Sequence, residues 1–269
     1  MTPPITLTIA GSDCSSGAGI QADLKTFSHH GCHGLTAISC VVAETPKVVS
    51  SIHPVPPSIL QEQIELLLNA YPIQAIKTGM LPSQDHLIAV VNALSNSRNI
   101  PLVIDPVMVS SSGSNLVDQH AIVTYREKLL PLASLITPNL PEASVLLDQA
   151  VESENDLVEA AQKLSELYNT SILLKGGHLP GKGDRVDTLY HNGTIHQFTS
   201  PLIDIACTHG TGCTLSAAIA SHLARERNMV DAISESIKWL HNAIKTSYQW
   251  NSPSGETIHC LNHLIKESS

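Results

Sequence analysis

The stretch over residues 208–214 has the sequence Thr-His-Gly-Thr-Gly-Cys-Thr and precedes a run of small and apolar residues. Its two glycines, Gly210 and Gly212, free the backbone to turn tightly. We expect the following run to form a helix, and the first amide hydrogens of a helix have no partner within it. Those N–H groups and the positive end of the helix dipole form a site for an anion. The stretch therefore predicts a cradle for a phosphate group or a developing oxyanion.

Cys213 stands inside this stretch and is the candidate reactive group. The field at a helix N-terminus lowers the pKa of a thiol, and a lowered pKa makes a cysteine more reactive. We therefore expect a lowered pKa for the Cys213 thiol. An alternative stays open, because glycine turns are common: the stretch is a turn before a buried helix, and Cys213 fills the core.

Six polar or small motifs extend this picture, because each directly follows an apolar run of the kind that forms a buried strand. They are Gly11-Ser12-Asp13, Glu44, Gly79-Met80, Asp105-Pro106, Asn139 with Glu142, and Lys175-Gly176. In open α/β sheets, ligands bind beyond the carboxyl ends of the strands. The six motifs therefore predict one binding edge.

Three of these residues have side chains suited to a nucleotide phosphate and its metal ion. Asp105 and Glu142 offer hard oxygen ligands, which Mg²⁺ prefers, directly or through water. Lys175 can meet a phosphate as a point charge. Taken singly, each motif also fits a turn, and Asn139 with Glu142 has the spacing of a helix-capping box.

Alternating strand and helix patterns must position these motifs. The sequence predicts strands over 5–10, 35–43, 73–78, 102–104, 134–136 and 171–174, and helices over 20–29, 58–70, 83–94, 118–130 and 156–167, with Ser58 as a cap. Such alternation indicates an α/β fold, a mainly parallel central sheet with helices on both faces. Asn192-Gly193 predicts a hairpin between strands over 186–191 and 194–198. Helices over 214–225 and 230–248 follow, and no linker or repeat divides the chain, so we expect one domain over 1–269.

Composition argues against several classes of protein. With 42% hydrophobic and 14% charged residues, the chain can build a sizeable core and is not of the disordered type. Its net charge of −9 and the lack of a lysine or arginine run argue against nucleic acid as a partner. No apolar run approaches the ~20 residues of a transmembrane helix, so we expect no membrane partner.

Two features bear on the cellular compartment. The N-terminal residues lack the basic region of a secretory signal. The six cysteines form no CxxC pair, and a chain of 269 residues does not need disulfides. We therefore expect reduced thiols and a cytoplasmic protein.

Together, the motifs resemble those of the hydroxymethylpyrimidine/phosphomethylpyrimidine kinases, a branch of the ribokinase superfamily. The resemblance covers nearly the whole chain, from the first strand to the segment over 255–263. The stretches that carry it are Ala10-Gly11-Ser12-Asp13, residues 17–26, Lys77-Thr78-Gly79-Met80, Asp105-Pro106-Val107-Met108, residues 137–143, Lys175-Gly176-Gly177-His178, and residues 209–214. It implies a ribokinase-like three-layer sandwich and, since relatives are often dimers, a homodimer.

The resemblance also implies an activity and a set of roles. It implies an ATP-dependent, Mg²⁺-using kinase that phosphorylates the CH₂OH group of 4-amino-5-hydroxymethyl-2-methylpyrimidine and then the monophosphate, in thiamine biosynthesis or salvage. The thiol of Cys213, where most sugar-kinase relatives have Asp, takes the proton from the substrate hydroxyl. By position, the anion hole is Gly210, Thr211 and Gly212; the substrate pocket is Gly11, Ala18, Asp23, Glu44, Met80 and Val107; the nucleotide contacts are Asn139, Lys175 and Thr208; and the metal ligands are Asp105 and Glu142.

The chain departs from the family pattern around the implied substrate pocket. Glu44 stands where the family usually has Gln, and Cys14 replaces a common Pro. Thr45-Pro46 replaces a polar pair. A Gln side chain both donates and accepts hydrogen bonds, whereas an ionised Glu only accepts them. Glu44 therefore either shares a proton with the pyrimidine ring or marks a changed substrate.

Three other functions remain open. A pyridoxal kinase of the same branch would place a pyridine alcohol in a similar pocket, and Glu44 favours this alternative. A cysteine hydrolase would use Cys213 with His209 as base, although no Asn or Asp partner is evident from the sequence. A binding protein that senses the pyrimidine would need no ATPase activity.

Overall fold

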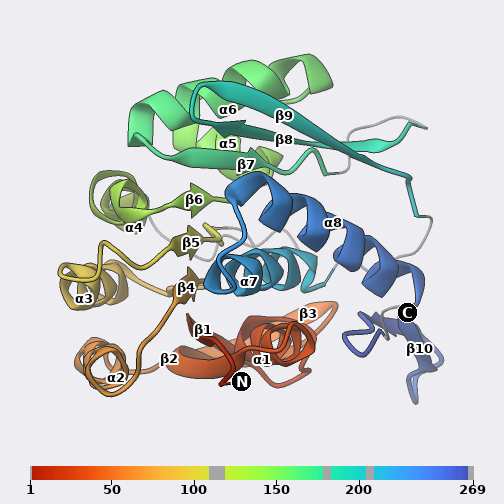
Figure 1. Ribbon diagram of the computed structural model, residues 1–269. Helices are drawn as coiled ribbons and strands as arrows, with labels where there is room; N and C mark the ends of the chain where they lie inside the picture. The colour runs from red at the N-terminus through yellow and green to blue at the C-terminus, as the bar shows by residue number, and fades with distance from the viewer. Residues whose placement is uncertain (1, 109–118, 178–182, 204–208, 266–269) are drawn as a thin grey trace.

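A nine-stranded sheet runs through the part of the chain that the computed structural model describes, residues 2–108, 119–177, 183–203 and 209–265. The strand order is β3-β2-β1-β4-β5-β6-β7-β8-β9. Helices cover both faces of this sheet (Figure 1). The expected three-layer α/β architecture is therefore confirmed.

Six strands run parallel and share one carboxyl edge. They are β1 (Ile5–Asp13), β2 (His33–Thr45), β4 (Ala75–Thr78), β5 (Leu102–Ile104), β6 (Leu135–Ile136) and β7 (Ser171–Leu174). The strand order reverses at β1, which lies between β2 and β4, and such a switch point opens a crevice beyond the strand ends. The six motifs of the sequence lie at this edge, as expected.

Three antiparallel strands complete the sheet at its two sides. β8 (Arg185–His191) and β9 (Thr194–Ser200) form the expected hairpin, with Asn192 and Gly193 at positive φ values of 49° and 77°. At the other side, β3 (Val48–Pro54) pairs with β2. The sequence does not predict β3, because its residues are mostly exposed and lack an apolar alternation.

The two faces of the sheet have separate hydrophobic cores. α1 (Gly19–His29), α7 (Thr211–Ala224) and α8 (Met229–Lys245) pack into one core, which includes Ala75 and Val103 of the strands. α2 (Pro57–Ala70), α3 (Gln84–Leu94), α4 (Gln119–Thr124), α5 (Leu140–Leu147) and α6 (Glu154–Tyr168) pack into the other, which includes Ile76 and Ile104. Successive strand residues thus serve opposite faces, as the two-residue period of a strand requires.

Two of the predicted helices need correction. The helix predicted over 118–130 is α4 followed by a π-helical turn, Tyr125–Leu129, and a 3-10 turn, Leu130–Leu132; residue 118 lies outside the described residues. α2 begins at Pro57 and has no side-chain cap, so Ser58 does not cap it. The fixed φ of proline suits the first turn of a helix and makes that cap unnecessary.

The C-terminal half differs more from the prediction. α7 begins at Thr211 rather than at residue 214, and α8 ends at Lys245 rather than at residue 248. The sequence does not predict α5, although it shows the capping box at its start. Past α8, β10 (Tyr248–Asn251) and β11 (Thr257–Cys260) form a second, two-stranded sheet where the sequence indicates only a short tail. Since β10 is exposed along its length, it lacks an apolar pattern.

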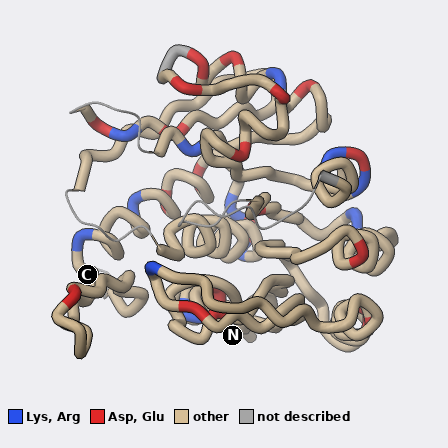
Figure 2. Tube along the Cα trace, turned by 180° about the vertical axis from the view of Figure 1, so that it is seen from behind, with Lys and Arg blue, Asp and Glu red and all other residues tan. Residues whose placement is uncertain are grey.

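Acidic and basic residues are interspersed along the chain and follow no single element (Figure 2). This distribution agrees with the absence of a lysine or arginine run in the sequence. Among the described helices, none combines the length and the apolar character needed to cross a membrane.

A buried ion pair ties α1 to β4. Lys77 Nζ lies 3.0 and 2.9 Å from the two carboxylate oxygens of Asp23, and the Thr8 hydroxyl donates to the same carboxylate at 2.6 Å. Both Asp23 and Lys77 are fully buried. Burial lowers the pKa of Lys77, but the charge of Asp23 outweighs this effect and holds that pKa above its usual range. Burial also raises the pKa of Asp23, against the lowering effects of Lys77 and Thr8. Three short hydrogen bonds to the carboxylate favour the ionised pair, which fixes α1 against the sheet.

We expect Lys77→Met to lower the free energy of unfolding by about 3–5 kcal/mol, because it leaves a buried carboxylate without its partner. The matched control is Lys163→Met, which removes the exposed pair with Glu159 and should cost less than about 0.5 kcal/mol. Urea denaturation measures both losses. Equal losses for the two variants would show that the buried pair does not stabilise the fold.

Candidate active site

A cleft of about 960 Å³ opens at the carboxyl edge of the parallel strands. Most residues that the sequence assigns to the site line it: Gly11, Ala18, Glu44, Met80, Asp105, Val107, Asn139, Glu142, Lys175, Gly210, Thr211, Gly212 and Cys213. Two assigned residues do not belong to this set. Asp23 is fully buried away from the lining, and Thr208 lies outside the described residues.

The first turn of α7 lines this cleft, and two of its amide hydrogens have no acceptor among the described residues. The Thr214 amide donates to the Gly210 carbonyl at 2.9 Å and closes the first turn. Within the described chain, the N–H groups of Gly212 and Cys213 have no hydrogen-bond partner. Gly210 has a φ of 78°, and a Cβ at this position would collide with the carbonyl of Gly17. Glycine is therefore required at position 210, where the turn meets the loop between β1 and α1.

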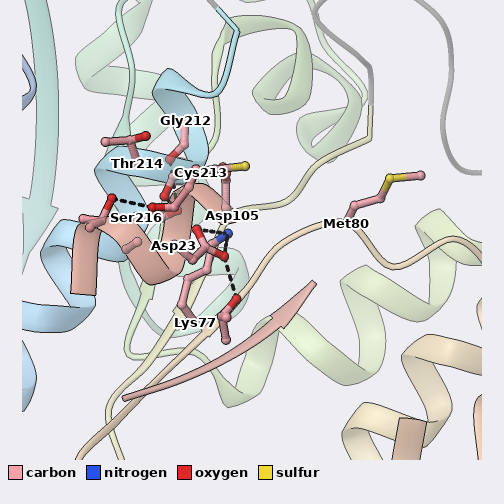
Figure 3. Close-up of polar contacts among 12 residues, drawn as sticks. Asp23, Lys77, Met80, Asp105, Gly212, Cys213, Thr214 and Ser216 are labelled. Carbon is pink, nitrogen blue, oxygen red and sulfur yellow. Dashed lines mark hydrogen bonds and ion pairs between the residues drawn. The ribbon is translucent and has the colours of Figure 1, made fainter. Parts of the chain in front are cut away.

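This turn lies between two parts of the cleft. On one side, Gly212 lies close to Asp105 and Lys175: a Cβ atom added to this glycine would be 3.4 Å from both Asp105 Oδ2 and Lys175 Nζ. On the other side, the Gly19 amide donates to the Cys213 sulfur. Figure 3 shows Gly212, Cys213 and Asp105 gathered at this point, with Met80 farther along the cleft. The free amides are thus placed where two ligands could meet.

The Cys213 thiol differs from the expectation. Its side chain is partly exposed in the cleft, yet the surrounding protein raises its pKa to about 11. Burial is the main cause, and the charges of Asp23 and Asp105 add to it. The charge of Lys77 and the hydrogen bond from Gly19 lower the pKa of the thiol, but their effect is smaller than the increase that burial causes. The prediction of a lowered pKa was therefore wrong, and the thiol is protonated at neutral pH.

Asp105 and Lys175 form an ion pair beside Gly212. Lys175 Nζ lies 3.1 Å from Asp105 Oδ1, and the Lys175 side chain is 15% exposed. Thr137 donates to the same oxygen at 3.4 Å. Among the described residues, none donates a hydrogen bond to Asp105 Oδ2, so this oxygen remains available to a ligand.

Glu142 and Asn139 form the capping box that begins α5. Each side chain accepts a hydrogen bond from the backbone amide of the other, at 2.9 Å in both cases. Burial raises the pKa of Glu142, Lys175 lowers it, and Asp105 raises it further. The box brings a second carboxylate into the lining that holds Asp105 and Lys175.

Asp23 has a different position from the one assigned to it. Its carboxylate is bound by Lys77, as Figure 3 shows, and by the Thr8 hydroxyl, and does not line the cleft. The sequence places Asp23 on the first turns of a helix but does not show which lysine it meets. In this structure Asp23 acts on the site through charge, because both it and Lys77 influence the pKa of Cys213.

Asp13 and His209 form a pair that the sequence prediction omits. His209 Nε2 lies 2.9 Å from Asp13 Oδ2. The same carboxylate accepts hydrogen bonds from the amides of Ser15, Gly17 and Ala18, at 2.7 to 3.1 Å. Burial raises the pKa of Asp13, but these hydrogen bonds outweigh it and hold the pKa far below its usual range. A carboxylate directly after the first predicted strand is the signal that points to Asp13.

The Asp13–His209 pair bears on the cysteine hydrolase, because it supplies the carboxylate partner that the sequence does not show. A hydrolase would also need His209 to take the proton of Cys213, but among the described residues His209 forms its hydrogen bond with Asp13 and none with Cys213. The ligand atoms of Asp13, Glu44 and His209 also lie within 4.8 Å of one another. Because the oxygens of Asp13 already accept several hydrogen bonds, we assign no metal ion to this cluster.

Two departures from the family pattern are in contact. The Glu44 amide donates to Cys14 Sγ at 3.3 Å, and the Cys14 thiol donates to the Glu44 carbonyl at 3.2 Å. A proline at position 14 has no thiol and could form neither bond. Burial raises the pKa of the Glu44 carboxyl, the charge of Asp13 raises it further, and His209 lowers it. Cys14 and Glu44 thus form one altered unit at the wall of the cleft.

Comparison with known proteins identifies the family of the chain. Residues 13–257 match the family described as phosphomethylpyrimidine kinase. The hydroxymethylpyrimidine/phosphomethylpyrimidine kinase of Escherichia coli (strain K12) is 41% identical over 239 residues, which are 88% of this chain and 90% of that protein. The chain spans about half the length of three other curated relatives that it matches, covering 52%, 50% and 47% of them.

Two solved structures share the fold closely. One is phosphomethylpyrimidine kinase from Clostridium difficile 630, with a TM-score of 0.79, 36% identity and coverage of 90% of this chain and 99% of that one. The other is an ADP complex of Bacillus subtilis pyridoxal kinase, with a TM-score of 0.88, 35% identity and coverage of 98% and 99%. Since the family match extends over most of the sequence, the chain belongs to the phosphomethylpyrimidine kinase family.

Proposed function

We propose that this protein is an ATP-dependent kinase that phosphorylates 4-amino-5-hydroxymethyl-2-methylpyrimidine and then its monophosphate, in thiamine biosynthesis or salvage. The observation that carries the proposal is that the amides of Gly212 and Cys213 have no hydrogen-bond partner among the described residues and belong to the same cleft as Lys175. Such amides at a helix N-terminus bind anions. Membership of the phosphomethylpyrimidine kinase family supports the same activity.

Different parts of the cleft would bind the pyrimidine alcohol and the nucleotide. Gly11, Ala18, Glu44, Met80 and Val107 would surround the pyrimidine alcohol at one part of the lining. Asn139 and Lys175 would contact the nucleotide at another part, and Thr208, outside the described residues, stays a proposed nucleotide contact. The first turn of α7 contacts both parts and would hold the phosphoryl group between them.

Charge stabilisation would then supply most of the catalysis. Phosphoryl transfer depends mainly on positioning and on stabilising the charge of the equatorial oxygens. The amides of Gly212 and Cys213 and the ammonium group of Lys175 are fixed before the substrates bind, so they need no reorganisation during transfer. The proton of the substrate hydroxyl leaves late, which places little demand on the strength of a base.

The donor set beside Lys175 suits Mg²⁺. Asp105 accepts its hydrogen bonds at Oδ1 and keeps Oδ2 for a cation, and Glu142 adds a second buried carboxylate. We propose that these two residues hold the ion directly or through water. When bound, Mg²⁺ neutralises charge on the nucleotide phosphates.

Cys213 would accept the substrate proton as a thiolate. With a thiol pKa of about 11, the thiolate fraction rises about tenfold for each pH unit between about pH 7 and 9. We therefore expect the kcat of the wild type to rise with pH over this range. Cys213→Ala should lower kcat by roughly 10²-fold and remove the rise.

The control for this experiment is Cys260→Ala, which removes a thiol outside the cleft. It should leave both kcat and its pH dependence unchanged. Steady-state assays at saturating ATP and pyrimidine alcohol give the comparison. An unchanged kcat in Cys213→Ala would remove the thiol from the mechanism.

Glu44 would read the pyrimidine in its protonated form, in which it donates a hydrogen bond as Gln does. Its raised pKa keeps the carboxyl protonated to a higher pH than usual. Both the wild type and Glu44→Gln share the rise of kcat/KM with the Cys213 thiolate, but only the wild type loses a hydrogen-bond donor as pH rises through about 5 to 8. The rise of kcat/KM for the pyrimidine alcohol should therefore be weaker in the wild type than in Glu44→Gln. If Gln produces no change across the range, Glu44 does not read the ring.

Pyridoxal phosphorylation is the second candidate, favoured by Glu44 and by the likeness to a pyridoxal kinase. A panel of the pyrimidine alcohol, its monophosphate and pyridoxal, each with ATP, decides between the two. We expect kcat/KM to be highest for the pyrimidine alcohol and measurable for the monophosphate. A higher value for pyridoxal would overturn the main proposal. If none of the three compounds stimulates ATP consumption, neither kinase activity is supported. A protein that turns over no ATP at all would favour the pyrimidine sensor.

Two properties accompany the proposal. We propose a homodimer, by analogy with relatives of this fold, and a cytoplasmic location that keeps the cysteines reduced. Sedimentation of the purified protein tests whether it is a dimer. The five cysteines in the described chain are free, which is compatible with a cytoplasmic location.

A further inference from the structure

The C-terminal segment after β11 returns to the first turn of α7. His263 is 4% exposed, and its Nε2 lies 3.1 Å from the hydroxyl of Thr214. Thr214 is fully buried and directly follows Cys213 (Figure 3). The contact joins positions 49 residues apart, so it ties the end of the chain to the cleft.

The direction of this hydrogen bond follows from the other ring nitrogen. The His263 ring also hydrogen-bonds to the Leu261 backbone, an interaction that raises its pKa and therefore is donated by a ring N–H. With Nε2 facing Thr214, the donor to Leu261 is Nδ1. In a neutral ring the remaining nitrogen is an acceptor. The Thr214 hydroxyl therefore donates to His263 Nε2.

His263 is neutral under ordinary conditions. Burial lowers its pKa to about 4, and the nearby charge of Lys25 acts in the same direction. The acceptor nitrogen is thus present throughout the range in which the kinase would work. Because the Thr214 hydroxyl is committed to His263, it does not compete with the Thr214 amide for the carbonyl of Gly210.

The tail that carries His263 is itself fixed. Leu261 is 4% exposed and packs in a small core with Ile244 of α8. The Asn262 amide donates to the Ala243 carbonyl at 3.2 Å. The rings of His263 and Trp239 lie 6.2 Å apart between centroids. The segment that carries the acceptor nitrogen of His263 is therefore held in place by packing and hydrogen bonds.

We propose that His263 is a positioning residue for phosphoryl transfer: through the Thr214 hydroxyl it fixes the first turn of α7, which presents the Gly212 and Cys213 amides to the cleft. This inference rests on the proposed kinase function for its catalytic consequence. Small displacements of a positioned group have large effects on rate, of up to ~10²-fold for about 1 Å. The contact is thus placed to influence kcat rather than substrate affinity.

Two substitutions of His263 give a matched pair. His263→Gln can place its carbonyl oxygen near the position of Nε2 and keep the acceptor, whereas the shorter side chain in His263→Asn cannot reach Thr214. We expect His263→Asn and Thr214→Val to lower kcat by roughly tenfold with little change in KM, and His263→Gln to retain kcat within about threefold. The double variant His263→Asn/Thr214→Val should be no slower than either single variant, since both remove one interaction.

A second readout does not depend on kinase activity. Amide hydrogen exchange of the peptide over 209–216 should accelerate in His263→Asn and Thr214→Val and stay close to wild type in His263→Gln. Wild-type kcat and unchanged exchange in the first two variants would overturn the inference, as would a kcat lost equally in the Asn and Gln variants. If the wild type phosphorylates neither alcohol, the proposed function fails, and the exchange pattern still decides whether His263 holds the turn.

Discussion

The site depends on amide hydrogens that a helix cannot satisfy by itself. The first turn of α7 leaves the N–H groups of Gly212 and Cys213 without partners in the described chain and directs them to a cleft at the sheet edge. Unpartnered buried amides are costly, so a fold keeps them where a ligand supplies the missing acceptor. An anion between Lys175 and the pyrimidine end of the cleft satisfies this need, which links the local backbone geometry to phosphoryl transfer.

Much of the surrounding structure holds that turn in place. Gly210 allows its backbone to approach the first loop, whose carboxylate Asp13 accepts hydrogen bonds from three backbone amides and pairs with His209. The buried Asp23–Lys77 pair fixes α1, which begins at the same loop, against β4. Several interactions therefore hold the first turn of α7 in position. The loops that make them come together because the parallel strands end at the same edge of the sheet.

The sequence predicts the parts of this protein that depend on local pattern. Apolar runs followed by polar motifs indicate the parallel strands and the binding edge, and nearly all assigned residues line the cleft. It fails where the outcome depends on distant neighbours. The helix dipole predicts a lowered pKa for Cys213, but burial and two carboxylates from other elements raise it. Likewise, the sequence cannot show that Asp23 meets Lys77, or that exposed residues 48–54 form an edge strand.

The central claim is that the Gly212 and Cys213 amides bind the phosphoryl group that is transferred. The most direct measurement is the NMR response of these two amides to a non-hydrolysable ATP analogue together with the pyrimidine alcohol. The account predicts downfield shifts and protection from hydrogen exchange for both amides when the two ligands are bound, because each N–H gains an anionic acceptor. Binding of both ligands with unchanged shifts and exchange at these two positions would contradict it.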